Sequence, residues 1–148
     1  MSSLQVRPIL DAEDVDAIIA IERAISRSAY RSAAFEEDAA TALEVGESQD
    51  HLVAVLEGRV VGFIVGKVSG LEFGSEERIG WINIVGVDPK VRHKGVGQLL
   101  GKALLENFRN KNVTRVRTLV AEDSHELQTF FTALGLTPSP MRVLERRV

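Results

Sequence analysis

The stretch from Ile79 to Phe108 reads IGWINIVGVDPKVRHKGVGQLLGKALLENF, and it decides the fold. Its first part, Trp81 to Val87, is rich in β-branched and apolar residues, which is typical of a strand buried on both faces. Pro89 lacks a backbone donor and disfavours helix in the residue before it, so we expect the strand to end just before it. Farther on, apolar residues recur at helical spacing: Val96, Leu99, Leu100, Ala103, Leu104 and Phe108. Gly95 and Gly97 therefore lie where a strand-end loop turns into a helix.

A helix N-terminus at this position has a chemical consequence. The first-turn N–H groups of a helix have no internal partner, and the aligned peptide dipoles make that end electropositive. Glycine lets a ligand approach the backbone closely. Arg92, His93 and Lys94 add positive charge at the same place. We therefore predict a phosphate or diphosphate site here; the alternative is a strand-to-helix turn in which the glycines serve only geometry.

The motif Val87-Asp88-Pro89-x-x-Arg92-x-x-Gly95-x-Gly97 resembles the signature of the GNAT superfamily, the acyl-CoA-dependent N-acyltransferases. The resemblance implies that backbone amides of this loop hold the diphosphate of coenzyme A, and that the preceding strand pairs with the pantetheine arm. The cofactor would be acetyl-CoA. The cofactor-binding residues implied in this way are Val85, Gly86, Val87, Arg92, His93, Lys94, Gly95, Val96, Gly97, Gln98, Ser124 and Phe131.

Composition bounds the class of protein. The 148 residues suit one domain, 1–148, with a sizeable core. The formal charge of −3 favours neither a nucleic-acid partner nor a basic membrane-surface protein. There is no cysteine, no apolar stretch of membrane-spanning length and no signal-peptide pattern at Met1 to Arg7. We therefore expect a cytoplasmic protein without disulfides, and we expect no metal site.

Hydrophobic periodicity and turn residues predict the other elements. We expect strands at Leu4–Ile9, His51–Leu56, Val60–Val68, Val113–Ala121 and Met141–Val148, and helices from Asp11 to about Ile25, at about Phe35–Val45 and after Asp123. The order β-α-α-β-β-β-α-β-α-β resembles the GNAT arrangement, as does Phe130 to Leu136 beside that family's Leu-Tyr-x-x-x-Gly-Phe. The resemblance implies an α/β (α+β) fold: a mixed, mostly antiparallel central sheet, splayed at its fourth strand, with helices on both faces.

Several local features carry expectations of their own. Asp11 is placed to cap the first helix with Asp14 at the reciprocal position, and Asp123 with Glu126 reads as a capping box. Gly62 and Gly66 suggest a bulge or a close neighbour. Gly86 could bulge and splay the central strand, or it could merely relieve crowding.

Acyl transfer to an amine needs a neutral amine, a donor for the thioester oxygen and a proton for the departing thiolate. The resemblance assigns the oxygen's donor to a backbone N–H within Val85-Gly86-Val87, and we choose Val85. Ser124 stands where many relatives have an Asn that touches pantetheine, although it could be a plain helix-start serine.

The acid and the base are where this sequence departs from the family. The tyrosine proposed to protonate the sulfur is replaced by Phe131, and the glutamate of the central strand by Trp81. The remaining candidates are Asn83 as a water orienter, and Tyr30, Glu22, Glu72, Glu77 and His125.

Other readings compete with an active transferase. The sequence matches neither of two nucleotide-binding motifs: a P-loop needs Gly-Lys followed by Ser or Thr, and a Rossmann fingerprint needs a glycine where Leu100 stands. A non-catalytic acyl-CoA sensor of the same fold, or an interaction domain without cofactor, stays open. The partner of the transferase would be an amine acceptor, either a small molecule or a protein, with no nucleic acid and no membrane. Dimers are common for this fold, and we predict a homodimer.

Overall fold

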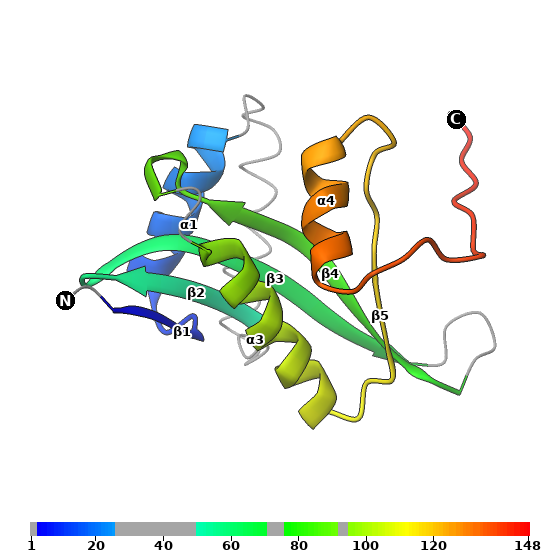
Figure 1. The fold of residues 1–148 in the computed structure, drawn as a ribbon, viewed down its shortest axis with the longest axis horizontal. Helices are drawn as coiled ribbons and strands as arrows, with labels where there is room; N and C mark the ends of the chain where they lie inside the picture. The colour runs from blue at the N-terminus through cyan, green and yellow to red at the C-terminus, as the bar shows by residue number, and fades with distance from the viewer. Residues whose placement is uncertain (1–2, 26–49, 71–75, 92–94) are drawn as a thin grey trace.

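The computed structural model describes residues 3–25, 50–70, 76–91 and 95–148. Within them, five strands form one sheet in the order β1-β2-β3-β4-β5. The strands are β1 (Leu4–Pro8), β2 (His51–Leu56), β3 (Arg59–Gly70), β4 (Arg78–Val87) and β5 (Arg115–Thr118). The helices are α1 (Ala12–Ile25), α3 (Val96–Asn110) and α4 (His125–Ala133), and a 3-10 turn, η3, spans Pro89–Val91. Figure 1 shows how these elements are arranged.

The sheet is mixed, as the sequence predicts. β1 to β4 pair antiparallel with their neighbours, and β5 pairs parallel with β4. The β2–β3 hairpin turns through Glu57 and Gly58, which have φ angles of 52° and 78°. A glycine at this second position suits a tight turn, because left-handed backbone carries no Cβ penalty there. The parallel pair needs a crossover, which α3 supplies.

Helices cover both faces of the sheet, which confirms the predicted layers. Because side chains alternate along a strand, neighbouring residues of β3 pack on opposite faces of the sheet, toward different helices. Phe63 belongs to the core cluster of α1, and Ile64 to the core cluster of α3. Leu100 and Leu104 of α3 are fully buried in that second cluster. The sheet is therefore the middle layer of three (Figure 1).

Glycines let α3 lie close to the sheet. A Cβ on Gly66 would lie 2.7 Å from Cζ of Phe108, and one on Gly80 would lie 2.6 Å from Cδ2 of the same ring. A Cβ on Gly62 would lie 2.8 Å from Cγ1 of Val96, in the first turn of α3. Both expectations for Gly62 and Gly66 are therefore met: each has a close neighbour, and a register shift lies beside each, between β2 and β3 at Gly62 and between β3 and β4 at Gly66.

The predicted cap of α1 is confirmed. The N–H of Asp14 donates to Oδ1 of Asp11 at 3.0 Å. The Asp14 carboxylate accepts from the N–H of Leu10 at 2.9 Å and from two nitrogens of Arg7 at 2.6 and 3.0 Å. The hydrogen bond from Arg7, before any other cause, holds the pKa of Asp14 below its usual value. This pair ties β1 to the start of α1.

The capping box predicted for α4 is wrong. The helix begins at His125, so Ser124 is the N-cap residue, and its side chain makes no cap hydrogen bond. A turn precedes the helix, in which the N–H of Ser124 donates to the carbonyl of Ala121 at 3.0 Å and the N–H of His125 to that of Asp123 at 3.1 Å. These backbone bonds hold Asp123 outside the helix. The strand predicted over Val113–Ala121 is also shorter, because only Arg115–Thr118 pair with β4.

The last predicted strand is not formed. Residues 141–148, all of them described, lie in no helix or strand. Their apolar side chains are exposed, Met141 to 50% and Leu144 to 91%. A strand pattern yields a strand only where a neighbour accepts its backbone, and these residues have no strand beside them within the described chain. The helix predicted at about Phe35–Val45 lies outside the described residues. None of the described helices is long and apolar enough to span a membrane.

Candidate active site

The site begins where β4 and β5 part. The two strands pair from Ile79 with Arg115 to Ile82 with Thr118, and the Thr118 hydroxyl donates to the carbonyl of Ile82 at 2.8 Å. β4 continues beyond this point to Val87, still paired with β3. Residues 83–87 of β4 thus have a strand on one side, and none on the other within the described chain. The predicted splay at the fourth strand is this separation.

A β-bulge in β4 marks the same point. Ile82 pairs with Gly66 and Ile84 with Val65, which leaves Asn83 without a partner residue. Residues two apart normally share a face of a strand. Here Ile82 packs in the cluster under α3, whereas Ile84 packs in the cluster under α1. The inserted residue reverses which side chains of β4 face α3 and which face α1 from this point on, and Asn83 itself is exposed.

The expectation that Gly86 bulges is therefore wrong, and its alternative is right. Gly86 pairs with Phe63 in regular register. A Cβ at this position would lie 2.5 Å from Cε1 of Phe63 and 3.1 Å from Cδ1 of Ile25. Gly86 relieves crowding between the strand, its neighbour and the last turn of α1.

Beyond the splay, the chain turns into the N-terminus of α3. The N–H of Asp88 donates to the carbonyl of Val61 at 2.8 Å and anchors the strand end. The N-cap residue Gly95 has φ 76° and ψ 14°, with no side-chain cap, and no atom of the described residues lies within 4 Å of where its Cβ would be. The N–H of Leu99 donates to the carbonyl of Gly95 at 3.0 Å. The three preceding amides, from Val96 to Gln98, belong to the first turn and point out of the helix end.

α4 packs beside this helix end through two glycines of α3. A Cβ on Gly97 would lie 3.0 Å from Cε1 of Phe130, and one on Gly101 would lie 2.5 Å from Cδ1 of Leu134. Phe130 stands edge to face with Phe131, with ring centroids 5.0 Å apart. Phe131 is only 6% exposed and belongs to the core under α3. Ser124 is half-buried at the start of α4.

Of the candidates for acid and base, Glu77 lies far from the splay. Its carboxylate lies 3.2 Å from Nε of Arg115 and 3.1 Å from the hydroxyl of Thr114, and the bond from Arg115 lowers its pKa, which weakens it as a base. It precedes the start of β4, eight residues before Val85, which is about 26 Å along a strand. Trp81, too, lies in the part of β4 that pairs with β5.

Glu22 lies closer to the splay. It is 1% exposed on α1, and Ile25, one turn later on that helix, reaches the position of a Cβ on Gly86. In the sequence, Glu22 is only one of several candidates. It shares the helical spacing of the apolar residues on the buried face of α1, so spacing alone does not mark it as functional. The candidates Tyr30 and Glu72, and the loop residues Arg92, His93 and Lys94, lie outside the described residues.

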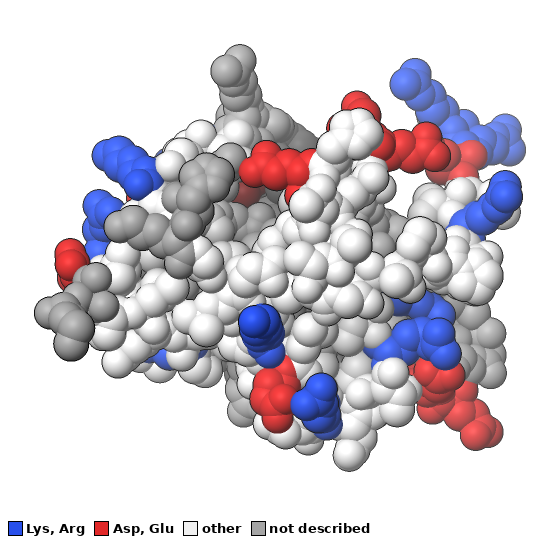
Figure 2. Space-filling view, in the orientation of Figure 1, with Lys and Arg blue, Asp and Glu red and all other residues white. Residues whose placement is uncertain are grey.

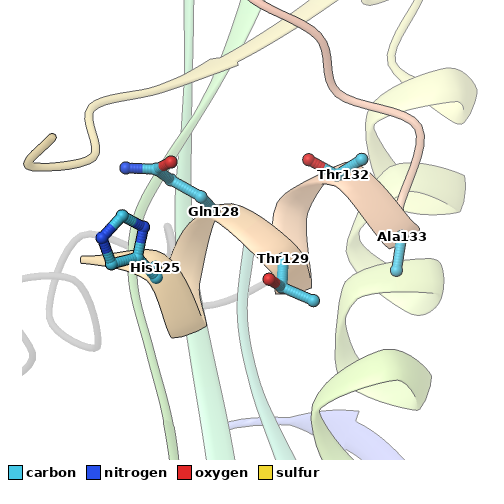
Figure 3. A pocket seen from close by; sticks show the side chains of 5 residues that line it. All are labelled: His125, Gln128, Thr129, Thr132 and Ala133. Carbon is cyan, nitrogen blue, oxygen red and sulfur yellow. The ribbon is translucent and has the colours of Figure 1, made fainter. Parts of the chain in front are cut away.

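A shallow hollow of about 500 Å³ lies along one side of α4. It is lined by His125, Gln128, Thr129, Thr132 and Ala133, whose side chains all come from that one helix (Figure 3). His125 is exposed there. The hollow contains no residue of β4 or of the first turn of α3, so we place the site at the splay and not in this hollow.

The geometry suits a particular kind of ligand. A free strand edge accepts an extended chain that carries amide groups, and an uncapped helix N-terminus accepts a phosphate or diphosphate. Both occur in sequence on either side of η3. The open space at Gly95 leaves room for an anion near the backbone. Figure 2 shows an uncharged centre on the face that carries α3 and α4, with charges of both signs around it. Coenzyme A, a diphosphate joined to an amide-bearing arm, has these two parts.

Comparison with solved structures identifies the fold. An aminoglycoside N-acetyltransferase, AAC(6')-Iy, in complex with CoA, matches with a TM-score of 0.80 at 15% identity, covering 99% of this chain and 96% of that one. Ard1 from Thermoplasma volcanium matches with a TM-score of 0.73 at 27% identity, covering 92% and 84%. The fold is that of the acyl-CoA-dependent acyltransferases.

Comparison with known sequences sets the family. The profile of the acetyltransferase (GNAT) family matches residues 15–136. The chain therefore belongs to the acetyltransferase (GNAT) family. A mycothiol acetyltransferase from Thermobispora bispora is 33% identical over 90 residues, which are 61% of this chain and 30% of that protein. The chain thus spans less than a third of that relative's length.

Proposed function

We propose that this chain is an N-acetyltransferase that transfers the acetyl group of acetyl-CoA to a primary amine by direct attack in a ternary complex. One observation carries the proposal. Within the described chain, residues 83–87 of β4 pair with a strand on one side only, and a few residues later the chain forms the N-terminus of α3, which has no side-chain cap. We take residues 1–148 as a single domain, because one sheet connects all the described elements. The lack of cysteine suits a cytoplasmic location.

The first turn of α3 would hold the diphosphate. The amides of Val96, Gly97 and Gln98 supply hydrogen bonds, and the helix dipole adds to them. Gly95 keeps the approach open. Arg92, His93 and Lys94 bring positive charge by their place in the sequence. The edge formed by Val85, Gly86 and Val87 would pair with the pantetheine arm as an added strand, and Ser124, whose side chain caps no amide, would contact that arm.

Acetyl-CoA supplies an acetyl group already activated as a thioester. The backbone N–H of Val85 would donate to the oxygen that gains charge during attack; donors of this kind are worth about 10²–10³ in rate. Asn83, exposed on the bulge, would orient water that takes the proton of the amine. Tyr30 is a second candidate from the segment that walls the acceptor site in this family. Phe131 is buried and has no proton to give, so it would only pack beside the site.

The acceptor is an amine, of a small molecule or of a protein. The structural matches include an aminoglycoside N-acetyltransferase in complex with a bisubstrate analogue and a ribosomal-protein-alanine N-acetyltransferase from Brucella melitensis. These support amine acceptors of both kinds, and the charges near the site do not choose between them.

Thiol release tests the proposal. The chain is incubated with acetyl-CoA and, one at a time, aminoglycosides, polyamines, amino acids and peptides with free N-termini or lysines. Because the chain has no cysteine, every thiol that a colorimetric reagent detects comes from coenzyme A. We expect thiol release to match the amount of N-acetylated amine found by mass spectrometry for at least one class of acceptor.

The alternative is a non-catalytic acyl-CoA sensor, favoured by the replacement of the family's tyrosine and glutamate with Phe131 and Trp81. Binding of coenzyme A without thiol release for any acceptor would support the sensor. Failure to bind coenzyme A at all would contradict both and leave an interaction domain.

A further inference from the structure

Three side chains form a row across the sheet, just before β4 and β5 part. Lys67 of β3 pairs with Trp81 of β4, and Trp81 pairs with Arg117 of β5. Residues that pair across neighbouring strands point to the same face of a sheet. Gly80, next to Trp81, faces α3, because a Cβ on it would lie 2.6 Å from the ring of Phe108. The row, which we call the cationic row, therefore lies on the opposite face, the one that α1 covers in part (Figure 1).

The two charges of the cationic row are not neutralised by other described residues. Lys67 is exposed and forms no ion pair among them. Arg117 is half-buried, and its buried Nε has no hydrogen-bond partner in the described chain. The carboxylate of Glu77, which lies near Arg117, is already bonded to Arg115 at 3.2 Å and to Thr114 at 3.1 Å. A buried donor without a partner costs free energy, and a carboxylate is the partner that best fits a guanidinium.

The cationic row lies within reach of the place proposed for the reaction. Trp81 comes four residues before Val85, which is about 13 Å along a strand. On the face that carries α3, the core around Phe131 lies beside the sheet, and the diphosphate at the start of α3 would lie on the same side. The acceptor amine would therefore approach from the face of the cationic row. An extended tripeptide spans about 10 Å, and the long side chains of lysine and arginine can cover the remaining distance.

We propose that Lys67 and Arg117 bind a carboxylate of the acceptor, and that the acceptor is a small amine with a carboxylate about 10 Å from its amino group, such as a short peptide. Arg117 offers a planar fork for both carboxylate oxygens, Lys67 adds a second charge, and the indole of Trp81 between them gives the acceptor an apolar surface. The same charges repel a polycation such as an aminoglycoside. This inference rests on the proposed transfer to an amine and narrows its acceptor.

Intrinsic fluorescence tests the subsite without any turnover. Trp81 is the only tryptophan of the chain, so its emission reports on the cationic row directly. The full chain, saturated with coenzyme A, is titrated with triglycine and with triglycinamide, which differ only in the carboxylate. Isothermal titration calorimetry checks both affinities. We expect triglycine to bind at least about 10-fold more tightly than its amide, because only triglycine can form hydrogen bonds between two charged groups.

Matched variants assign this preference to the two cations. In the double variant Lys67→Gln/Arg117→Gln, the two peptides should bind within about 2-fold of each other. Lys102→Gln is the control, because it removes one charge that is exposed on α3. It should leave the preference unchanged. Equal affinities of the parent for the two peptides, no binding of either by calorimetry, or a preference that the double variant retains would each overturn the proposal.

Thiol release from acetyl-CoA separates this proposal from the proposed function. Release with both peptides at equal kcat/KM would overturn the carboxylate subsite and leave the transfer intact. A preference for triglycine in binding, without thiol release from any acceptor, would support the subsite and count against the transfer.

Discussion

At the scale of single residues, Asp14 links three parts of the chain. It accepts hydrogen bonds from Arg7 of β1 and from the N–H of Leu10, and its own N–H is capped by Asp11. Its pKa is lowered in the folded state, chiefly by Arg7. A lowered carboxylate pKa contributes stability that is present above the unfolded value of about 3.9 and is lost as the pH falls through the folded value.

Asp14→Asn should therefore destabilise the protein in a pH-dependent way. At pH 7 we expect a loss of about 2 kcal/mol in the free energy of unfolding, since hydrogen bonds to a charged group are removed. The difference from the parent should shrink as the pH falls below about 4, where Asp14 of the parent becomes protonated as well. Urea unfolding of both proteins at several pH values measures it. An equal difference at pH 7 and pH 3 would contradict the role given to the charge.

Some residue roles were predictable and others were not. The cap at Asp11 follows from local spacing, and the structure confirms it. The cap at Asp123 follows from the same rule and is wrong, because a turn closed by Ala121 places Ser124 at the helix start. Glu77 is a candidate base from sequence proximity alone, and the structure places it before the start of β4, far from Val85. The sequence alone does not show how far Glu77 lies from Val85, because that distance depends on where the strand begins and how it pairs.

At the scale of elements, the bulge at Asn83 turns β4 over between its two halves. Deletion of Asn83 would retain the partners of Ile82 and Ile84 on β3 and remove only the inserted residue. We expect the deleted protein to stay folded and to bind coenzyme A, but to lose about 10²–10³ in kcat, because the donor at Val85 would no longer be aimed as before.

Asn83→Ala separates the bulge from the side chain, since it keeps the inserted residue and removes only the amide. Steady-state thiol release, with far-UV circular dichroism as the check on folding, compares both proteins with the parent. An unchanged kcat in the deleted protein would contradict the role of the bulge. A large loss in Asn83→Ala as well would instead assign part of the effect to the side chain as a water orienter.

The glycines beneath α3 set its distance from the sheet. Gly80→Ala places a Cβ 2.6 Å from the ring of Phe108, which is itself fully buried, so we expect a loss of about 1–3 kcal/mol in stability. Gly70→Ala is the control at the end of the adjoining strand, where no atom of the described part of the chain lies within 4 Å of the Cβ position, and it should change stability by less than about 0.5 kcal/mol. Thermal unfolding compares the two. Equal effects would show that strand propensity or chain entropy, and not contact with Phe108, decides the outcome.

The sequence gives only a weak indication of the bulge. Asn83 is a polar residue within the apolar run from Trp81 to Val87, a break that the strand prediction passed over. Gly86 was the more conspicuous break and proved to be a packing glycine. The residue type marks both Asn83 and Gly86 as unusual in a buried strand. Only the pairing with β3, in which Val65 faces Ile84 and Gly66 faces Ile82, shows that Asn83 is the extra residue.

At the scale of the whole molecule, the fold was largely predictable because several independent patterns agree. The buried strand, the glycine loop and the amphipathic helix occur in order between Ile79 and Phe108, and the family profile matches residues 15–136 around them. The final strand was not predictable in the same way. Its alternation is real, but no strand lies beside it within the described residues to accept its backbone.

We infer that the amides at the start of α3 hold the diphosphate of coenzyme A. Two glycines that differ only in place test it: Gly95 and Gly58 have φ angles of 76° and 78°, and among the described residues no atom lies within 4 Å of either Cβ position. Gly95→Asp adds a carboxylate at the helix end, and Gly58→Asp adds the same charge with the same backbone strain in the β2–β3 turn.

Isothermal titration calorimetry with coenzyme A measures the outcome for the parent and both variants. We predict that Gly95→Asp weakens binding by at least about 10-fold, that is by about 1.4 kcal/mol, and that Gly58→Asp leaves it near the parental value. Equal affinity of the Gly95→Asp protein and its parent would contradict the account.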